Sequence, residues 1–283
     1  MTASLNPYIS QFGEEFDAEK SSQYRMAIQC DLGGLSFALL DTEIQTFIGV
    51  EFYQSELLSN SNDLVHTLER ALESKGLNSK DFQSVIYLVD NRFGSLIPEP
   101  LFNEADQAKY LDFSFQLPES YTIVSEPIST IHSYLVYATP KALLDKMSAK
   151  WENVKITHSS SVFINIVMKS DLDSGVFLQV RNRDFDMIIK KDGKLFFFNN
   201  FKFITKEDFA YFLLFAMEQN QCSGQNTPVY FSGLILPASE IIDLCGRYVK
   251  DIRFVEDKHS PRVSKALESV PYHYYFTHYQ ALR

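Results

Sequence analysis

Residues 25–53 read RMAIQC DLGG LSFALL DTEIQ TFIGVEFY, and this stretch decides the fold. Three runs rich in aliphatic and aromatic residues, at 25–30, 35–40 and 46–53, are typical of β-strands. Only short turns connect them, which predicts antiparallel hairpins. Apolar residues then recur at helical spacing from 64 to 72, and a short apolar strand follows at 85–89. The predicted order is therefore β-β-β-α-β.

The same order returns about 150 residues further along the chain, where it forms a second unit of similar pattern but negligible sequence identity. Strands are predicted at 176–180, 186–190, 194–201 and 229–231, with a helix at 209–217 before the last of them. Thr205, followed three residues later by Asp208, predicts an N-terminal cap for this helix. Because residues 209–217 are apolar nearly all round, we expect both faces of the helix to be covered. A helix at 238–248 and a strand at 252–255 complete the unit.

The segment between the two units predicts a strand at 135–141, a helix at 142–150, a strand at 154–157 and a helix at 159–169. Repeated supersecondary units indicate repeated domains. We therefore divide the chain into a polar tail at 1–22, a first domain at 23–170 and a second domain at 171–283. The second domain includes an aromatic C-terminal segment, PYHYYFTHY at 271–279.

A duplicated β-β-β-α-β order, with LVYATPKALLDKM at 135–147 leading into a strand and a helix, resembles the actin-like ATPase superfamily. Over about residues 23–283 the chain most resembles domain-of-unknown-function family 3822, a bacterial family with this fold. The resemblance implies an α/β fold of two ribonuclease-H-like domains, with an interdomain cleft that clasps Mg-ATP in the nucleotide-binding relatives.

In such relatives two hairpin turns, one in each domain, hold the phosphates, and each commonly carries Asp-x-Gly. The first turn here is Asp31, Leu32, Gly33 and Gly34, and it matches that pattern. The resemblance implies that the glycine amides approach phosphate oxygens and that Asp31 holds the magnesium shell. The alternative is a hairpin that needs only a positive φ angle and a turn-forming aspartate.

The rest of the predicted nucleotide site departs from the superfamily pattern. The second turn contains Arg181 and Arg183 but no glycine; both arginines are candidates to bind an anion, or are solvated charges. Gly233, where relatives have paired glycines on the adenine side, is a candidate nucleotide contact or only a bend between strand and helix. Asp90 lies where relatives place the carboxylate that orients the attacking water, and is otherwise an ordinary loop-starting residue.

Charge and composition exclude several function classes. Residues 1–140 carry 7 basic and 20 acidic side chains, and residues 141–283 carry 19 and 16. The acidic first half argues against nucleic-acid binding. Three isolated cysteines favour a reducing cytoplasm over disulfides or a zinc site, and no apolar run is long enough for a membrane span. We expect a soluble cytoplasmic protein.

The sequence therefore favours a non-catalytic or weakly nucleotide-responsive interaction protein with a degenerate nucleotide site. Its acidic first half and aromatic C-terminal segment would be surfaces for an unidentified protein partner. One alternative is a working Mg-ATP-binding ATPase or small-molecule kinase, in which Asp31 holds magnesium and Asp90 orients the nucleophile. Another is an assembly scaffold that forms homo-oligomers. Fold resemblance alone does not decide among them.

Overall fold

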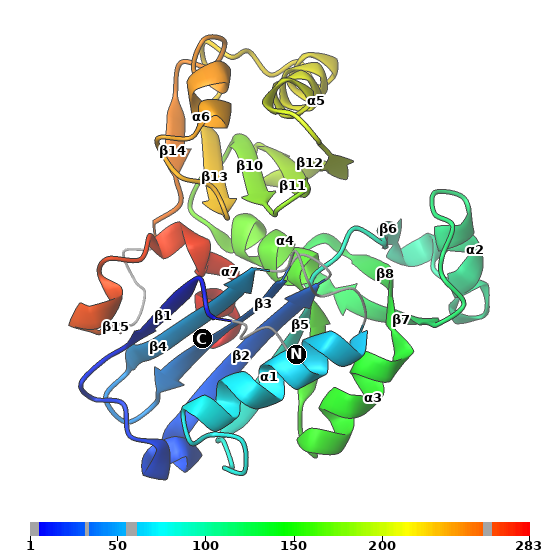
Figure 1. Ribbon diagram of the computed structural model, residues 1–283. Coiled ribbons are helices and arrows are strands. Elements are labelled where there is room, and N and C mark those ends of the chain that lie inside the picture. The colour runs from blue at the N-terminus through cyan, green and yellow to red at the C-terminus, as the bar shows by residue number, and fades with distance from the viewer. Residues whose placement is uncertain (1–5, 32–33, 55–60, 257–261) are drawn as a thin grey trace.

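The computed structural model describes residues 6–31, 34–54, 61–256 and 262–283. They form two lobes with helix α4 (Ser159–Lys169) between them, and a smaller sheet projects from the side of the first lobe (Figure 1). One apolar core fills the first lobe and continues past α4 to Phe177, Ile188 and Tyr230 of the second lobe, and a second core lies within the second lobe.

The first lobe is built on a seven-stranded sheet whose order begins at β1 and ends at β9, with β15 pairing with β4 beside this path. In sheet order the strands are β1 (Ile9–Phe12), β4 (Thr46–Gln54), β3 (Gly34–Asp41), β2 (Tyr24–Asp31), β5 (Ser84–Val89), β9 (Lys155–His158) and, on β4, β15 (Arg262–Val263). Helices α1 (Ser61–Ser74) and α3 (Lys141–Lys150) cover one face. The C-terminal helix α7 (Phe276–Ala281) and α4 lie on the other.

The second lobe repeats this pattern on a five-stranded sheet. Its strands, in sheet order, are β12 (Lys194–Lys202), β11 (Asp184–Lys191), β10 (Gly175–Val180), β13 (Val229–Gly233) and β14 (Ile252–Phe254). β2 is antiparallel to β3 and parallel to β5, and β10 is likewise antiparallel to β11 and parallel to β13. The predicted duplication of β-β-β-α-β units is therefore present, with strand bounds within two residues of the predicted ones.

Helix α5 (Lys206–Gln219) begins as the sequence predicts. The Thr205 hydroxyl accepts a hydrogen bond from the Asp208 amide, and the Asp208 carboxylate accepts one from the Thr205 amide. The prediction that both faces are covered is wrong, because Tyr211 and Phe215 stack on each other on an exposed face. Helix α6 (Glu240–Cys245) is shorter than predicted.

The two ends of the chain depart from the predicted domain layout. Residues 9–12, predicted within a polar tail, are strand β1 and pair with β4. Residues 262–283, predicted with the second domain, return to the first sheet. There the Tyr279 ring stacks on Phe47 with 4.0 Å between ring centroids. Aromatic rings bury a large apolar area, so the aromatic C-terminal segment is part of the first lobe's core.

A small third sheet is present that the sequence pattern does not predict. It consists of β6 (Gly94–Pro98), β8 (Ser133–Pro140) and β7 (Tyr121–Ile128), with helix α2 (Gln107–Asp112) packed on it around buried Leu111. Only β8 was predicted, because β6 and β7 are mostly half-buried and have no clear period-two pattern.

Candidate functional site in the cleft between the lobes

The cleft lies where strands from both sheets end. β5 ends at Val89 and is followed by Asp90, and β10 ends at Val180 and is followed by Arg181. The carboxyl ends of β5 and β10 point toward each other across the start of α4 (Figure 1). Functional groups of α/β proteins commonly lie at such strand ends, and this makes the cleft the candidate site.

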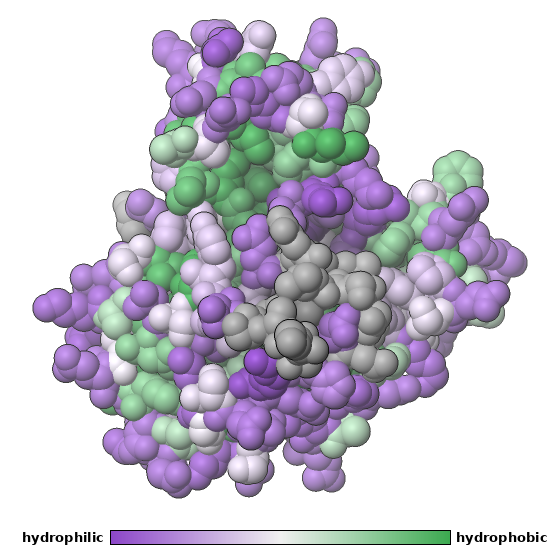
Figure 2. Space-filling model, viewed as in Figure 1, coloured by the Kyte–Doolittle hydropathy of each residue, from purple (hydrophilic) through white to green (hydrophobic). Residues whose placement is uncertain are grey.

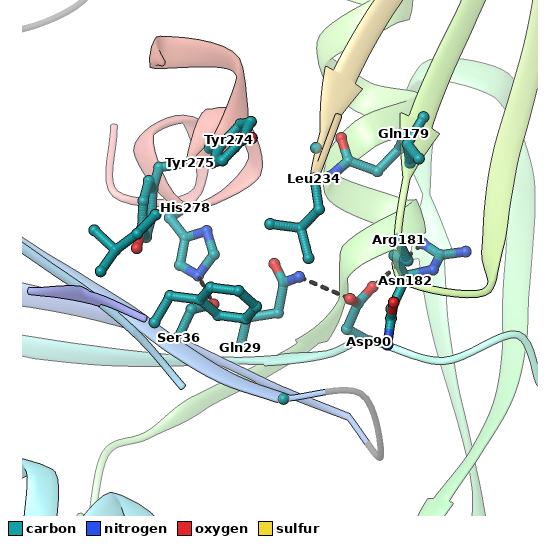
Figure 3. Close-up of a pocket in the computed structure, with 15 residues that line it drawn as sticks. Gln29, Ser36, Asp90, Gln179, Arg181, Asn182, Leu234, Tyr274, Tyr275 and His278 are labelled. Atoms are coloured by element: carbon teal, nitrogen blue, oxygen red, sulfur yellow. Dashed lines mark hydrogen bonds and ion pairs between the residues drawn. The ribbon is translucent and has the colours of Figure 1, made fainter. Parts of the chain in front are cut away.

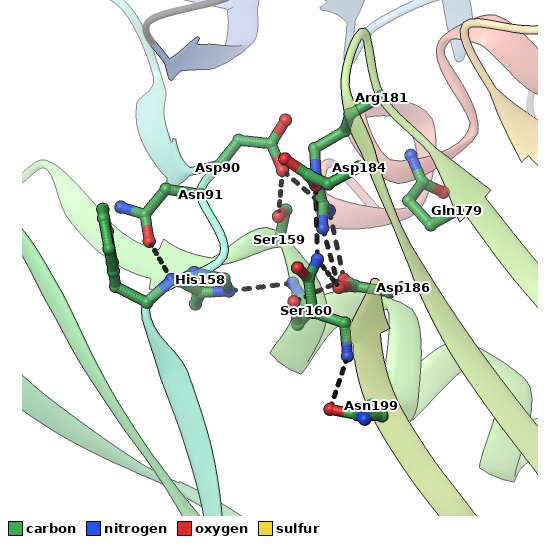
Figure 4. Close-up of polar contacts among 12 residues, drawn as sticks. Asp90, Asn91, His158, Ser159, Ser160, Gln179, Arg181, Asp184, Asp186 and Asn199 are labelled. Carbon is green, nitrogen blue, oxygen red and sulfur yellow. Dashed lines mark hydrogen bonds and ion pairs between the residues drawn. The ribbon is translucent and has the colours of Figure 1, made fainter. Parts of the chain in front are cut away.

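Arg181 stands at the centre of a buried polar cluster (Figure 4). Its side chain is 3% exposed. One terminal nitrogen, Nη1, lies 3.2 Å from the Asp90 carboxylate, Nη2 lies 2.7 Å from Asp186, and Nε lies 2.5 Å from Asp184. Three carboxylates thus surround one guanidinium, two of them from the start of β11 and the third, Asp90, from the other lobe.

Neutral donors complete the cluster. The Ser159 hydroxyl donates to Asp90 and the Ser160 hydroxyl donates to Asp186, each at 2.5 Å. Both serines lie in the first turn of α4, where the helix dipole favours negative charge. The Asn200 side-chain amide donates to both Asp184 and Asp186. The cluster therefore ties the first lobe, the central helix and the second lobe together.

Burial and the three carboxylates set the ionisation of the cluster. Burial alone would lower the pKa of Arg181, but Asp184, Asp186 and Asp90 raise it well above its usual value. Burial raises the pKa of Asp186, but Arg181 and the hydrogen bonds lower it by more, so the pKa is lowered overall. For Asp90 burial prevails over Arg181 and Ser159, and its pKa is raised. Arg181 and Asp186 therefore form the charged centre, and Asp90 is its most easily protonated member.

The C-terminal segment forms another wall of the cleft (Figure 3). His278 on α7 lies with its Nε2 atom 2.9 Å from the Ser36 hydroxyl, and Tyr274 and Tyr275 line the same cavity. His273 Nε2 lies 2.8 Å from the carbonyl oxygen of Ile235, which belongs to the second lobe. The segment is therefore packed between the lobes as well as on the first sheet.

The space left in the cleft is small. The inner cavity, lined by Gln29, Asp90, Gln179, Arg181 and His278, has a volume of about 30 Å³, room for only a few water molecules. A shallower hollow of about 220 Å³ adjoins it, lined by Tyr8, Phe52, Phe203 and Leu234 among others. Figure 2 shows apolar residues gathered on the second lobe above this hollow.

Gly233 has a structural reason to be glycine. Its φ angle is +85°, and a Cβ atom there would overlap the carbonyl oxygen of Val180 on the neighbouring strand. The next residue, Leu234, donates its amide hydrogen to that same oxygen at 2.8 Å. Gly233 therefore lets the chain leave β13 across the end of β10, next to Arg181.

We expect Gly233→Ala to lower the free energy of unfolding by about 2 to 3 kcal/mol, because the left-handed backbone and the overlap with Val180 both disfavour a side chain. Urea denaturation measures this. Gly193→Ala is the matched control, since Gly193 has a φ angle of +72° and a Cβ atom there would meet nothing within 4 Å, so only the backbone strain remains. Equal losses for the two variants would show that the contact with Val180 does not matter.

The predicted site residues lie in different places in the structure. Asp90 and Arg181 come together, and Gly34 and Gly233 line the same cavity. Arg181 is not a solvated side chain, because it is 3% exposed and three carboxylates of the chain itself engage it; its role as an anion-binding residue of a nucleotide site stays a prediction. Arg183 is exposed and lies outside the cluster. Gly33 and the side chain of Asp31 lie outside the described residues; Asp31 ends β2, opposite Gly34.

Several members of the cluster were not predicted at all: Ser159, Ser160, Asp184, Asp186 and Asn200. The available signals were the SSS run at 159–161, directly after a buried strand, and the two acids of DFD at 184–186. Side chains two apart on a strand share a face, so Asp184 and Asp186 both point at Arg181.

Among the described residues, no group of three or more His, Cys, Asp or Glu side chains is placed to hold a metal ion. No helix in the described part is long and apolar enough to cross a membrane.

Comparison with solved structures defines the class of fold. A Bacteroides thetaiotaomicron protein with actin-like ATPase fold and unknown function is similar over 85% of this chain and 93% of its own, with a TM-score of 0.75 and 17% identity. A chain of the PilM-PilN type IV pilus biogenesis complex is similar over 91% of this chain and 97% of its own, with a TM-score of 0.62 and 10% identity. The ethanolamine utilization protein EutJ from Carboxydothermus hydrogenoformans is similar over 92% of this chain and 88% of its own, with a TM-score of 0.51 and 8% identity. The chain therefore has the actin-like ATPase fold.

The family follows from the sequence itself. A family model described as "Protein of unknown function (DUF3822)" matches residues 13–252, and the chain belongs to this family. A comparison with curated proteins gave no match. The predicted family and fold are both confirmed, while at these identities the structural neighbours establish the fold alone.

Proposed function

We propose that this protein is a non-catalytic interaction protein, built on an actin-like ATPase scaffold whose nucleotide site is degenerate. The observation that carries the proposal is the Arg181 cluster. In nucleotide-binding relatives the second-lobe turn offers its amides to phosphates. Here the turn contributes Arg181, and Asp90, Asp184 and Asp186 already supply the negative charge that phosphates would bring.

The size and lining of the cleft support the same proposal. Small-molecule sites usually enclose about 300 to 1,000 Å³, whereas the inner cavity encloses about 30 Å³ and the outer hollow about 220 Å³. Tyr274, Tyr275 and His278 of the C-terminal segment line the inner cavity. The small, aromatic-lined space supports a degenerate nucleotide site.

A role in protein interaction is supported by exposed aromatic and aliphatic side chains on the second lobe, including Phe196, Ile204, Tyr211 and Phe215. Such exposed groups mark docking surfaces when they cluster. One structural neighbour, PilM, was solved in a complex with PilN, which makes a protein partner a reasonable expectation for this scaffold. A cytoplasmic location belongs to the same proposal.

Isothermal titration with Mg-ATP and Mg-ADP tests the proposal. We expect no binding tighter than millimolar, and the same result for Asp31→Ala. Asp145→Ala, an exposed acid on α3, is the control for a general charge effect. Micromolar binding that is lost in Asp31→Ala but kept in Asp145→Ala would overturn the degenerate site and favour the ATPase or kinase.

Two further measurements separate the alternatives. A working ATPase or kinase would release phosphate at a rate that falls in both Asp31→Ala and Asp90→Ala. An assembly scaffold would change its light scattering with protein concentration or with nucleotide. Under the proposal, phosphate release stays at the level of the variants, and light scattering corresponds to one unchanging species.

A further inference from the structure

Strand β12 forms an open edge of the second sheet. It is nine residues long and lies at one end of the sheet order, and in the described part of the chain it pairs only with β11. Helix α5 covers one face of the sheet there and leaves the edge uncovered (Figure 1). A long uncovered edge is a template for another strand.

The hydrogen-bonding register shows which backbone groups of β12 point outward. The Phe203 amide donates to the Arg183 carbonyl, and the Arg181 amide donates to the Asp184 carbonyl. Bonded pairs alternate along an antiparallel ladder. From Phe203 back toward the middle of the strand, the odd-numbered residues of β12 therefore bond to β11. The amide and carbonyl groups of Phe198, Asn200 and Lys202 face the open edge.

One outward amide already holds a substitute partner. The Asn200 backbone N–H donates to the side-chain oxygen of Asn199, which Figure 4 labels, at 2.9 Å. This side-chain oxygen stands where the carbonyl oxygen of an added strand would accept the same hydrogen. A displaceable acceptor on an edge amide indicates a strand edge that is protected while it is empty.

The charges along the edge indicate what would bind there. Exposed Lys194 and Lys202 stand at the two ends of β12, and exposed Arg183 lies beside Lys202 in the register. At the other end, Lys191 Nζ lies 4.1 Å from the centre of the Phe196 ring, which is 58% exposed. Asp192 in the hairpin turn lies near these cations, and Asp184, opposite Lys202 in the register, is already paired with Arg181. The edge is therefore basic at both ends and aromatic in the middle.

We propose that the open edge of β12 binds an extended segment of a partner protein, apolar in its centre and acidic at its ends, as an added strand. Backbone hydrogen bonds to Phe198 and Asn200 provide affinity, and the four cations select the acidic ends. A second copy of this chain fits less well, because antiparallel pairing about Phe198 places Lys194 opposite Lys202 of the second copy, and like charges opposite one another destabilise a sheet.

This inference rests on the proposed interaction function and names the chemistry of its partner, but its test involves no nucleotide. The probe is a fluorescein-labelled nine-residue peptide of alternating valine and threonine with a glutamate at each end, measured by fluorescence anisotropy. We expect it to bind at least tenfold more tightly than the same peptide with lysine at each end. N-methylation of alternate backbone nitrogens should abolish binding, because it blocks the strand ladder.

Variants of the protein locate the binding site. We expect the double variant Arg183→Glu and Lys202→Glu to weaken binding at least tenfold, and Lys146→Glu, an exposed lysine of α3, to leave it unchanged. Asn199→Ala should strengthen binding several-fold, because it removes the competing acceptor. If the double variant does not fold, hydrogen exchange of the wild-type protein locates the peptide instead. The glutamate peptide should protect the amides of Phe198 and Asn200 from exchange.

Several results would overturn the proposal: no binding of the glutamate peptide, equal binding of the lysine peptide, or protection elsewhere in the chain. A wild-type dimer that pairs through β12 in sedimentation experiments would overturn the choice of partner in favour of a second copy. None of these results affects the nucleotide titration, so a failure here is distinct from a failure of the degenerate-site proposal.

Discussion

Arg181→Ala is expected to lower the free energy of unfolding by about 3 to 5 kcal/mol, the usual cost of removing one partner from a buried ion pair. The variant leaves Asp90, Asp184 and Asp186 close together without a cation. Chemical denaturation at pH 8 measures the loss. Because protonation relieves the repulsion among carboxylates, the loss should be smaller at pH 5 than at pH 8.

Two further variants make this prediction specific. Arg183→Ala removes an exposed arginine from the same turn, and it should change stability by no more than about 0.5 kcal/mol. Arg181→Met combined with Asp186→Leu should recover part of the stability lost in Arg181→Ala, since it removes one of the three carboxylates left without a cation. A loss that is as large for Arg183→Ala, or that does not depend on pH, would show that the cluster does not hold the lobes in the way its geometry indicates.

The sequence predicted the parts of the fold that depend on neighbouring residues. Short turns between apolar runs determine hairpins, so the strands from residue 24 to 54 and the hairpin of β11 and β12 were found. The cap at Thr205 was found because its partner, Asp208, is three residues away. The fold class followed from the order of these local elements, without any sequence repeat.

The site depends on contacts between distant residues, which local sequence patterns do not determine. An arginine in a turn is usually exposed. Arg181 is buried instead, because Asp90, 91 positions away in the chain, forms an ion pair with it. The packing of Tyr279 on Phe47 likewise joins the C-terminal segment to a strand near the other end. Aromatic content alone did not indicate that this segment, predicted with the second domain, would also pack on the first sheet.

Acid is expected to destabilise the protein from about pH 6.5 down to about pH 3, a window set by two buried histidines. Burial lowers the pKa of His158 to about 4 and the pKa of His278 to about 3. In the unfolded chain both titrate near pH 6.5. Below that pH the unfolded state binds more protons than the folded state, so stability is complete above pH 6.5 and is lost as the pH falls. The full losses correspond to about 3 kcal/mol for His158 and about 5 kcal/mol for His278.

Neighbouring carboxyl groups affect other parts of the pH profile. The lowered pKa of Asp186 reduces stability only below about pH 4, the pKa of an aspartate in the unfolded chain. The raised pKa of Asp90 acts above that pH and opposes the loss of stability caused by the histidines. A variant that removes one histidine therefore isolates its share better than the wild-type profile does. His278→Gln suits this purpose, because glutamine keeps a hydrogen-bonding group toward Ser36 and does not titrate.

The midpoint of thermal unfolding at pH 8, 6.5, 5 and 4 provides the measurement. His278→Gln should lose less stability than the wild type between pH 6.5 and 4, by up to about 1.4 kcal/mol for each pH unit. His66→Gln is the control, since the His66 side chain is 70% exposed, and its profile should follow the wild type. Parallel profiles for His278→Gln and the wild type would mean that His278 takes up its proton in the folded state. In that case the C-terminal segment would open at the cleft in mild acid rather than hold a neutral histidine between the lobes.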